Sequence, residues 1–571
     1  MSIYQALKDY QEVITRGDYL VFDAPVSCRF VGRFFRFENQ TAMKPSLAAS
    51  VYVNWVEEGA ADLTLKHVFN RTLARDAFTL TISEDKELVI ESQNLRGFRY
   101  AQEALEKVMT VKEGRLYLPI VSVRHSPSFA MRGVIEGFYG TPWTREERLD
   151  CLSFIADKGM NTYMYAPKND DYQRSHWREP YPEDWVAHFK DLIQLAKERQ
   201  VDFWYMISPG LDFDYTKEED YQLLYQKLQQ LLDLGVCHFG LLLDDIDYHI
   251  VDAVERRFKK TAYAQAHLAT AVYQFLQRQH AAPDLVVCPT EYDNHHDSLY
   301  LAELSEAIPA EVAFFWTGPS TLASQISQAD IETMAAIYRR PIIIWDNIPV
   351  NDYQNDFERL FLTPFANRSP FLCQPDYQVR GIVSNPMISW ELSKPTLIDM
   401  SRYLWDAKRY QPSYSWLEAL RDYTGDEAMA LALLRFAWHN GNRHLHRDLP
   451  FEVEEALMRK DIASLSAWVA EIVELVDKLK KLDIPEFQQA IAPWFDRAKT
   501  DQSFWRAILE QAPDLEQQYA ELQEQRHRIG SNIPSRFYQL HYLQENRGLG
   551  NQARVAEAKA EDYTSLVYKG E

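Results

Sequence analysis

The stretch FGLLLDDI, residues 239–246, is a short apolar run that closes on two adjacent acids, Asp244 and Asp245. A run that is apolar at every position is typical of a strand covered on both faces, as in a parallel sheet. Two neighbouring carboxylates have no structural use at the end of such a strand, because burying them unpaired costs on the order of several kcal/mol. Capping of a following helix would explain one of them. The pair together favours a site that uses carboxyl chemistry.

Seven further runs of this kind lie between residues 130 and 390, and the eight alternate with stretches of helical periodicity. Each repeat of about 30–45 residues has the size of a strand-and-helix unit. Eight such units in about 260 residues predict a closed (β/α)8 barrel of the TIM type. A doubly wound sheet is the competing architecture, but no glycine-rich phosphate loop follows the first run. The eight runs are 132–137, 162–168, 203–209, 239–245, 285–292, 312–318, 342–347 and 382–386.

The pattern changes on both sides of the barrel. Residues 78–82 and 87–90 alternate apolar and polar positions, which predicts a hairpin, and residues 99–109 follow with helical spacing. The fold class is therefore α/β, and we expect three domains: a small α+β domain over 1–125, the catalytic barrel over 126–400 and an α-helical domain over 401–571. Helices of the last domain are expected at 427–439, 450–481, 485–509 and 513–542.

Composition excludes several classes of protein. The formal net charge of -22 repels phosphate backbones, so nucleic acid is not expected as a partner. The five cysteines form no CxxC motif, which favours a reducing compartment over a metal or disulfide framework. The sequence contains no apolar stretch long enough to span a membrane, and the first residues lack the apolar segment of a signal peptide. We therefore expect a cytoplasmic protein that does not bind membranes.

Polar and aromatic side chains gather at the ends of the eight runs. In a barrel these ends converge on one face, which is where barrel enzymes carry their active sites. Loops are polar in any fold, but Trp316 and Trp345 beside acids and amides favour a site. The run ends are Glu136-Gly137, Pro167-Lys168, Asp244-Asp245, Glu291-Tyr292, Trp316-Thr317, Trp345-Asp346-Asn347 and Asn385.

Seven motifs follow one another along the predicted barrel: RGVIEGFYGTPW at 132–143, YAPKNDD at 165–171, LDDI at 243–246, CPTEY at 288–292, WTG at 316–318, WDN at 345–347 with Asn351-Asp352, and SNP at 384–386. In this order they resemble the motifs of glycoside hydrolase family 84, which contains the O-GlcNAcases and related β-N-acetylglucosaminidases. The resemblance covers about residues 125–400 and is weaker in the N-terminal domain.

The resemblance implies retaining hydrolysis of a terminal β-linked N-acetylglucosamine, with the acetamide of the substrate as the nucleophile and an oxazoline as the intermediate. Asp244 would accept the acetamide N–H and stabilise charge on the forming oxazoline. Asp245 would be the general acid and then the base toward water. Neighbours on an extended strand point to opposite sides, so we expect one carboxylate to reach the acetamide and the other the glycosidic oxygen.

The resemblance also assigns the remaining site residues. The pocket for the acetyl group would be formed by Cys288, Tyr292, Thr317 and Trp345, with the Tyr292 hydroxyl on the acetamide oxygen and Cys288 as a small buried thiol. Ligands of the sugar hydroxyls would be Lys168, Asp352, Asn385 and the backbone of Gly137, while Asn347 would lie near the acid and the leaving-group oxygen. No cofactor and no metal is expected.

Other functions remain open on the sequence alone. The acids Asp244, Asp245 and Asp247 with His249 form a cluster of metal-ligand types, although their spacing matches no specific zinc or calcium loop. Within the hydrolases, a hyaluronidase-like activity on a polymeric N-acetylglucosaminide is an alternative, and a sugar-binding barrel without turnover is another. The expected partner is a β-N-acetylglucosaminide on a glycoprotein, a glycopeptide or an oligosaccharide, and the C-terminal helices offer a surface for a homodimer.

Overall fold

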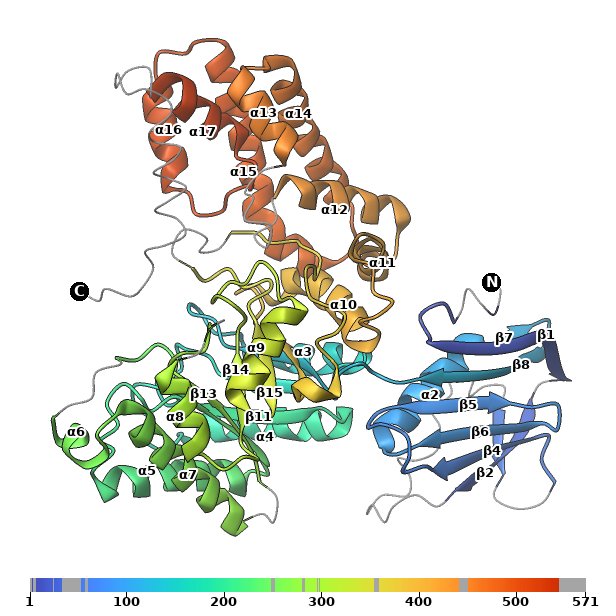
Figure 1. The fold of residues 1–571 in the computed structure, drawn as a ribbon. Helices are drawn as coiled ribbons and strands as arrows, with labels where there is room; N and C mark the ends of the chain where they lie inside the picture. Colours follow the sequence, from blue (N-terminus) through green and yellow to red (C-terminus); the bar gives the residue numbers. More distant parts are fainter. Residues whose placement is uncertain are drawn as a thin grey trace.

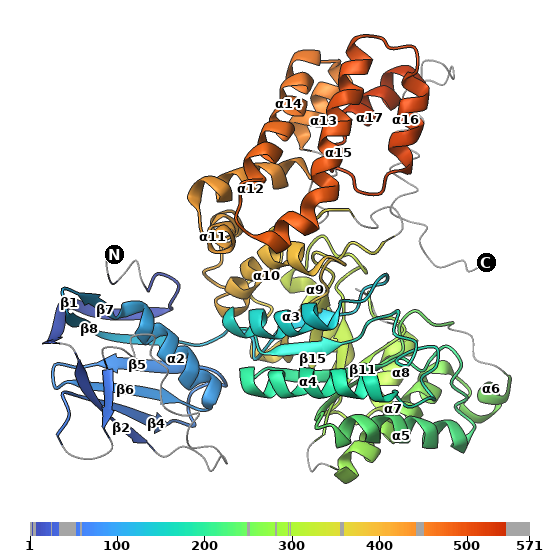
Figure 2. The same ribbon diagram turned by 180° about the vertical axis from the view of Figure 1, so that it is seen from behind.

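The protein consists of a mixed sheet domain, a closed barrel and a stack of helices that rises from one side of the barrel (Figure 1). The computed structural model describes residue 3 and residues 7–23, 25–32, 53–56, 60–247, 252–279, 283–294, 296, 298–353, 359–440 and 450–543. Seen from behind, the sheet domain again lies beside the barrel and the helices above it (Figure 2). No helix among the described residues has the length and apolar content to cross a membrane.

Eight parallel strands close the predicted TIM-type barrel, in the order β10-β11-β12-β13-β14-β15-β16-β9. Their side chains alternate between two apolar clusters, so that Ile135 and Met164 fill the barrel while Val134 and Tyr163 face the surrounding helices. Burial on both faces explains why the runs are apolar at every position. The strands are β9 (Met131–Glu136), β10 (Thr162–Tyr165), β11 (Asp202–Ile207), β12 (His238–Leu242), β13 (Asp284–Cys288), β14 (Ala313–Trp316), β15 (Ile342–Asp346) and β16 (Val379–Ser384).

The helices that surround the barrel follow the strands in the sequence. Several begin with a polar cap; in α3, for example, Thr144 and Glu147 form a reciprocal capping box at the first turn. In Figure 2, α3 and α4 lie across the near side of the barrel. The helices are α3 (Arg145–Asp157), α4 (Glu183–Arg199), α5 (Glu218–Asp233), α6 (Asp252–Phe258), α7 (Thr261–Gln279), α8 (Leu299–Ala307), α9 (Gln328–Tyr338) and α10 (Trp390–Trp405), with the short turn η2 (Pro375–Tyr377) before β16.

The N-terminal part is a mixed sheet with α2 (Leu95–Val108) packed on it. The expected hairpin is formed by β5 (Phe78–Ile82) and β6 (Glu87–Ser92), which pair antiparallel. The strand order is β1-β8-β5-β6-β4-β2-β3, with β7 on β8. The other strands are β1 (Glu12–Asp23), β2 (Val26–Gly32), β3 (Val53–Val56), β4 (Leu63–Phe69), β7 (Thr110–Lys112) and β8 (Arg115–His125).

The C-terminal part is helical, as expected, but two of the predicted helices are interrupted: 450–481 contains two helices, and 513–542 contains two helices separated at residues 525–532. The stretch 450–481 divides at Lys460, which has a left-handed backbone, and Asp461 then caps the next helix by accepting from the Ser464 N–H. The helices are α11 (Pro412–Thr424), α12 (Glu427–His439), α13 (Phe451–Arg459), α14 (Ile462–Leu479), α15 (Pro485–Leu509), α16 (Leu515–Glu524) and α17 (Ile533–Tyr538), followed by a π-helical turn at Gln539–Leu543.

A buried ion-pair network joins the sheet domain to the barrel. Asp76, between β4 and β5, pairs with Arg96 of α2 at 3.0 Å and with Arg132 of β9 at 2.9 Å, and Asp76 and Arg132 are fully buried. The amide of Asn161 donates to the same carboxylate at 2.8 Å. Burial opposes ionisation, but the two guanidinium groups outweigh it and hold the pKa of Asp76 well below its ordinary value. The network therefore fixes the position of the sheet domain at the start of β9.

Replacing Asp76 with alanine is expected to lower the free energy of unfolding by about 3–5 kcal/mol, because it leaves the buried Arg132 cation without its carboxylate. Urea denaturation followed by tryptophan fluorescence measures this. The exposed Asp85 in the β5–β6 turn is the matched control, and its alanine variant should stay within about 0.5 kcal/mol of the wild type. Equal stability of the two variants would contradict the role of the network.

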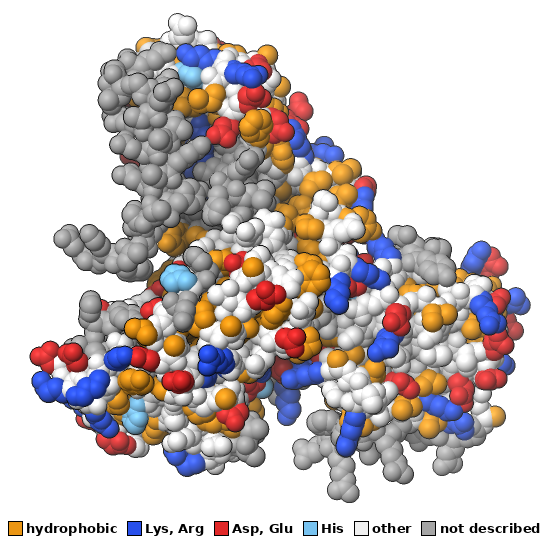
Figure 3. Space-filling view, viewed as in Figure 1, with side chains coloured by type: hydrophobic (Ala, Val, Ile, Leu, Met, Phe, Trp, Pro, Cys, Tyr) orange, Lys and Arg blue, Asp and Glu red, His pale blue; other side chains and the backbone are white. Residues whose placement is uncertain are grey.

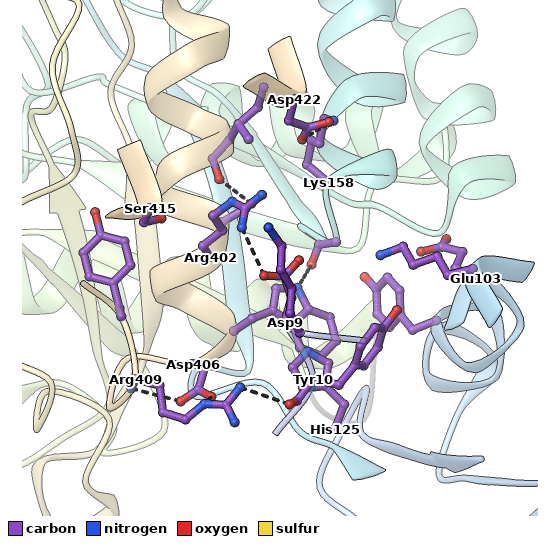
Figure 4. A pocket seen from close by; sticks show the side chains of 18 of the residues that line it. Asp9, Tyr10, Glu103, His125, Lys158, Arg402, Asp406, Arg409, Ser415 and Asp422 are labelled. Carbon is purple, nitrogen blue, oxygen red and sulfur yellow. Dashed lines mark hydrogen bonds and ion pairs between the residues drawn. The ribbon is translucent and has the colours of Figure 1, made fainter. Parts of the chain in front are cut away.

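A cavity of about 570 Å³ lies where the sheet domain, the turn between α3 and β10, and helices α10 and α11 meet (Figure 4). Ion pairs cross it, among them Arg402 to Asp9 at 3.2 Å. The His125 ring at the end of β8 stacks on Trp405 of α10, with ring centroids 4.5 Å apart. Burial, together with the cations of Lys107, Arg409 and Arg132, lowers the pKa of His125 to about 3. The neutral imidazole is thus part of the domain junction.

This histidine predicts a loss of stability in mild acid. Its folded pKa lies below the unfolded value of about 6.5, so the unfolded chain takes up the proton first and stability falls as the pH drops below about 6.5. Between pH 6.5 and pH 5 the contribution should amount to about 2 kcal/mol. His125→Phe keeps a stacking ring without a titrating group, so its denaturation midpoint should change less with pH than that of the wild type. Parallel pH dependences for the two proteins would refute the assignment.

Candidate active site

The strand ends bring the predicted site residues together at the carboxyl-terminal end of the barrel. Each residue follows or closes a strand: Gly137 after β9, Lys168 after β10, Asp244 and Asp245 after β12, Cys288 and Tyr292 at and after β13, Thr317 after β14, Trp345, Asn347 and Asp352 at and after β15, and Asn385 after β16. Direct hydrogen bonds and ring contacts link most of them. The cavity at the domain junction lies at the opposite, amino-terminal end of β10 and shares none of these residues.

Asp244 is a buried carboxylate with one satisfied and one unsatisfied oxygen. Its Oδ2 accepts from the Lys168 ammonium, and both side chains are almost completely buried. Its Oδ1 is buried and has no hydrogen-bond partner among the described residues. Buried polar atoms are normally hydrogen-bonded, so this unpaired oxygen indicates that a bound ligand supplies the donor. Lys168, expected on the sugar hydroxyls, contacts the acid itself and lies 5.7 Å from the Trp345 ring centroid.

Asp245 is held by two tyrosine hydroxyls. Tyr139 donates to Oδ2 at 2.8 Å and Tyr292 donates to Oδ1 at 3.0 Å. Burial and the Asp245 carboxylate raise the pKa of both phenols well above the ordinary value, so both hydroxyls remain protonated donors. In this structure the Tyr292 hydroxyl, which we expected on the acetamide oxygen, is thus engaged with the predicted acid.

The expectation that the two acids are neighbours on an extended strand is wrong. Strand β12 ends at Leu242, and Asp245 has a left-handed backbone with φ of 51°. This conformation is unusual for a residue with a side chain and is concentrated at functional sites. A local turn, rather than strand alternation, therefore sets the different environments of the two carboxylates.

The residues predicted to surround the acetyl group lie close together. Cys288 is fully buried, and burial raises the pKa of its thiol far above the ordinary value, so it stays neutral and is no nucleophile. Thr317 contacts the same segment, with its backbone N–H donating to the Tyr292 carbonyl at 2.9 Å. Trp345 packs over Gly137, where a Cβ would come within 2.3 Å of the indole ring. Glycine is therefore required at 137 for the ring to keep this position.

A chain of amides connects the last two strand ends to the first. Asn385 accepts from the Gly137 N–H at 3.2 Å and donates to the Asn347 oxygen at 2.9 Å. That oxygen also accepts from the Trp345 indole at 3.1 Å. Asp352 accepts from the Tyr139 N–H at 2.8 Å. The backbone after β9 and the side chains at the ends of β15 and β16 thus form one hydrogen-bonded wall beside the acids.

Not every polar or aromatic strand end belongs to the site. Glu136 is buried in a paired contact with Arg148 of α3, and Asp346 is buried against Arg368. Trp316 faces the surrounding helices and donates to the Asn294 carbonyl at 2.8 Å. These groups stabilise the barrel from outside. The expectation that Trp316 marks the site is wrong, because its side chain alternates away from the barrel axis.

Three residues near the acids were not among the predicted site residues. Tyr139 stands inside the motif that supplies Gly137, so its position gave a signal. Arg174, in the loop after β10, donates to the Tyr139 hydroxyl at 2.8 Å. Asp293 accepts from Thr321 at 2.6 Å, and burial raises its pKa. Nothing in the local sequence identifies the last two, because their partners are distant along the chain.

A family model described as beta-N-acetylglucosaminidase (NAGidase) matches residues 132–437. This match covers more than half of the chain. The protein belongs to this family. All the residues assembled at the carboxyl-terminal end of the barrel lie inside the matched region, from Gly137 to Asn385.

Individual members of the β-N-acetylglucosaminidase family are similar to the chain over different lengths. The Protein O-GlcNAcases of Mus musculus and Rattus norvegicus are 36% identical to it over 265 residues, 45% of this chain. The match spans 28% of the length of each of these two relatives. The solved structure of CpGH84B resembles 92% of this chain and 98% of its own with a TM-score of 0.72 at 23% identity, which supports the fold. An O-GlcNAc hydrolase variant of Thermobaculum terrenum matches 76% of this chain and 97% of its own with a TM-score of 0.64 at 29% identity.

The metal alternative would use Asp244, Asp245, Asp247 and His249. Among the described residues, no group of three or more histidine, cysteine, aspartate or glutamate side chains is arranged to hold a metal ion. His249, one of the four residues of that alternative, lies outside the described residues. Asp244 pairs with an ammonium group, the Lys168 side chain.

Proposed function

We propose that the protein is a retaining β-N-acetylglucosaminidase that removes terminal β-linked N-acetylglucosamine with the help of the substrate's own acetamide. The observation that carries the proposal is the unpartnered, buried Oδ1 of Asp244 beside the Lys168 ammonium. The N–H of a bound 2-acetamido group would satisfy this oxygen. Membership of the family and the wall of amides beside the acids support the same substrate.

In the first step the acetamide oxygen attacks C1 and the C1–O bond to the leaving group breaks. Asp245 gives its proton to the departing oxygen, while Asp244 accepts the acetamide N–H and stabilises the positive charge on the forming oxazoline. Asp245 therefore has to be protonated when the substrate is bound. Tyr292, released from Asp245, would bind the acetamide oxygen. The Lys168 ammonium keeps the Asp244 carboxylate in place.

In the second step Asp245, now a carboxylate, takes a proton from water. The water oxygen bonds to C1, the oxazoline opens and the acetamide is restored. Both displacements invert C1, so the product keeps the β configuration. Cys288, Thr317 and Trp345 would enclose the acetyl methyl, and Gly137, Asn347, Asp352 and Asn385 would hold the sugar and leaving-group oxygens.

Release of 4-nitrophenol tests the proposal. We expect wild-type protein to hydrolyse 4-nitrophenyl β-N-acetylglucosaminide with the same rate before and after treatment with a chelator. The corresponding β-N-acetylgalactosaminide, which differs at one hydroxyl, should react more slowly. Hydrolysis that chelation abolishes would favour the metal alternative. Tight binding of N-acetylglucosamine without any turnover would favour the sugar-binding alternative.

The proposal extends to the aglycone of the substrate, the cellular compartment of the protein and its assembly. Relatives that are named Protein O-GlcNAcase favour a glycoprotein or glycopeptide over a hyaluronan-like polymer, and a comparison of initial rates on the two kinds of substrate distinguishes them.

The free cysteines are compatible with the reducing cytoplasm, and cell fractionation tests this location. A homodimer through the C-terminal helices is supported by Phe451 and Met458, which are exposed seven residues apart on α13. Light scattering on the full chain measures its mass.

A further inference from the structure

Arg174 is a half-buried cation whose hydrogen bonds go to a phenol and a backbone carbonyl. It donates to the Tyr139 hydroxyl at 2.8 Å and to the carbonyl of Asp245 at 3.4 Å. Its guanidinium also lies over the Tyr139 ring, 5.4 Å from the centroid. No carboxylate among the described residues forms an ion pair with it at close range, whereas Arg178, four residues on, pairs with Asp212 and Asp220.

Both hydrogen bonds of Arg174 act on Asp245, one directly and one through Tyr139. One guanidinium nitrogen holds the main chain of Asp245 at the left-handed turn, and the other acts on the carboxylate through the Tyr139 hydroxyl, which donates to Oδ2. A phenol that accepts a hydrogen bond from a cation becomes a stronger donor, because chains of hydrogen bonds polarise one another. The result is a clamp on the backbone and the side chain of one acid.

The loop that carries Arg174 is fixed by contacts that do not involve it. Asp170 accepts from the hydroxyls of Tyr165 and Tyr181 at 2.8 and 2.7 Å, and Trp177 donates to Asp212 at 2.8 Å. The loop is therefore expected to keep its fold when the Arg174 side chain is shortened. This separates the role of the guanidinium from the stability of the loop.

We propose that Arg174 is a positioning residue for proton transfer at Asp245, acting through Tyr139, an inference that rests on the proposed function. When Asp245 gives its proton to the leaving oxygen, negative charge develops on its carboxylate, and the polarised Tyr139 hydroxyl stabilises that charge. The same contacts hold the carboxylate when it later takes a proton from water. The contribution is largest where the leaving group most needs the proton.

A pair of aryl N-acetylglucosaminides tests this role. A 2,4-dinitrophenyl leaving group departs without protonation, whereas a 4-methoxyphenyl leaving group requires it. Arg174→Met should lower kcat/KM on the 4-methoxyphenyl substrate about 10- to 100-fold more than on the dinitrophenyl substrate, the range expected for a lost hydrogen bond to a charged group. Arg174→Lys, which can still donate to Tyr139, should recover part of that selective loss.

Two further variants make the test specific. Tyr139→Phe should give the same selective loss, and the double variant should lose little more than either single variant, because both changes break one chain of contacts. Arg178→Met, the control in the same loop, should leave the ratio between the two substrates unchanged. An equal loss on both substrates in Arg174→Met, or additive losses in the double variant, would overturn the proposal. Failure of the wild type to hydrolyse either glycoside would instead refute the proposed function, and this inference with it.

Discussion

Asp245→Ala should lose about 10²- to 10⁴-fold in kcat/KM on a 4-methoxyphenyl N-acetylglucosaminide, the usual range for removal of a general acid. On the 2,4-dinitrophenyl substrate the first step should be nearly unaffected, because this leaving group needs no proton. Oxazoline hydrolysis still needs a base, so the variant should accumulate the intermediate and show a burst of dinitrophenol. Stopped-flow absorbance measures the burst, and steady-state rates on the two substrates give the selectivity.

The exposed Asp247, two residues further on, provides the control for Asp245. Its alanine variant should keep both rates close to those of the wild type, because its side chain lies outside the group of contacts around the two tyrosine hydroxyls. Activity of Asp245→Ala that is intact on the 4-methoxyphenyl substrate would show that another group donates the proton. Asp293, the acid that follows Tyr292 in the sequence and has a raised pKa, would then be the next candidate.

Asp244→Asn should lower kcat by about 10²- to 10³-fold on both aryl substrates alike, the range found when a group that stabilises transition-state charge is removed. Asparagine keeps the volume and can still accept the acetamide N–H, but it supplies no negative charge to the oxazoline and leaves the Lys168 ammonium without its carboxylate. Steady-state kinetics on the two substrates measure the loss.

The pattern of the Asp244 losses distinguishes the two acids. An equal loss on good and poor leaving groups is expected because the acetamide attacks C1 in both reactions. A loss confined to the poor leaving group would mean that Asp244, and not Asp245, is the proton donor. Circular dichroism of the variant serves as the folding control, since the buried lysine loses its partner.

The barrel could be predicted from the sequence because strands that are buried on both faces are apolar at every position, and such runs can be recognised without knowledge of distant contacts. Every one of the eight predicted runs overlaps a strand, and the helices α12 (Glu427–His439) and α15 (Pro485–Leu509) lie where helical spacing predicts them. The antiparallel pair β5 and β6 could be predicted from a different pattern, the alternation of apolar and polar positions, because one face of it packs on α2 and the other does not.

Features set by single residues or by distant contacts were harder to predict. The break at Lys460 and the turn at Asp245 depend on a left-handed backbone at a residue other than glycine, which composition does not reveal. The predicted runs also extend past the ends of the strands. Strand β12, for example, ends at Leu242, whereas the apolar pattern continues to Leu243. The alternation of side chains along an extended strand therefore does not apply to Asp244 and Asp245, which lie beyond the end of β12.

The partners within the site were predicted least well. The contacts of Lys168 with Asp244 and of Arg174 with Tyr139 join residues 76 and 35 positions apart. Convergence of strand ends in a barrel shows that such residues meet, but it does not show which atoms pair. Lys168 was accordingly expected on the sugar and is found on the acid.

The central claim is that the substrate's acetamide oxygen is the nucleophile. Replacing the hydrogens of its methyl group with fluorine withdraws electrons from that oxygen while the glycosidic bond stays the same. We predict that kcat/KM on 4-methylumbelliferyl glycosides falls steeply and in order from N-acetyl through N-fluoroacetyl and N-difluoroacetyl to N-trifluoroacetyl. Rates that are independent of fluorine content would contradict the account and point to a protein carboxylate or to water as the attacking group.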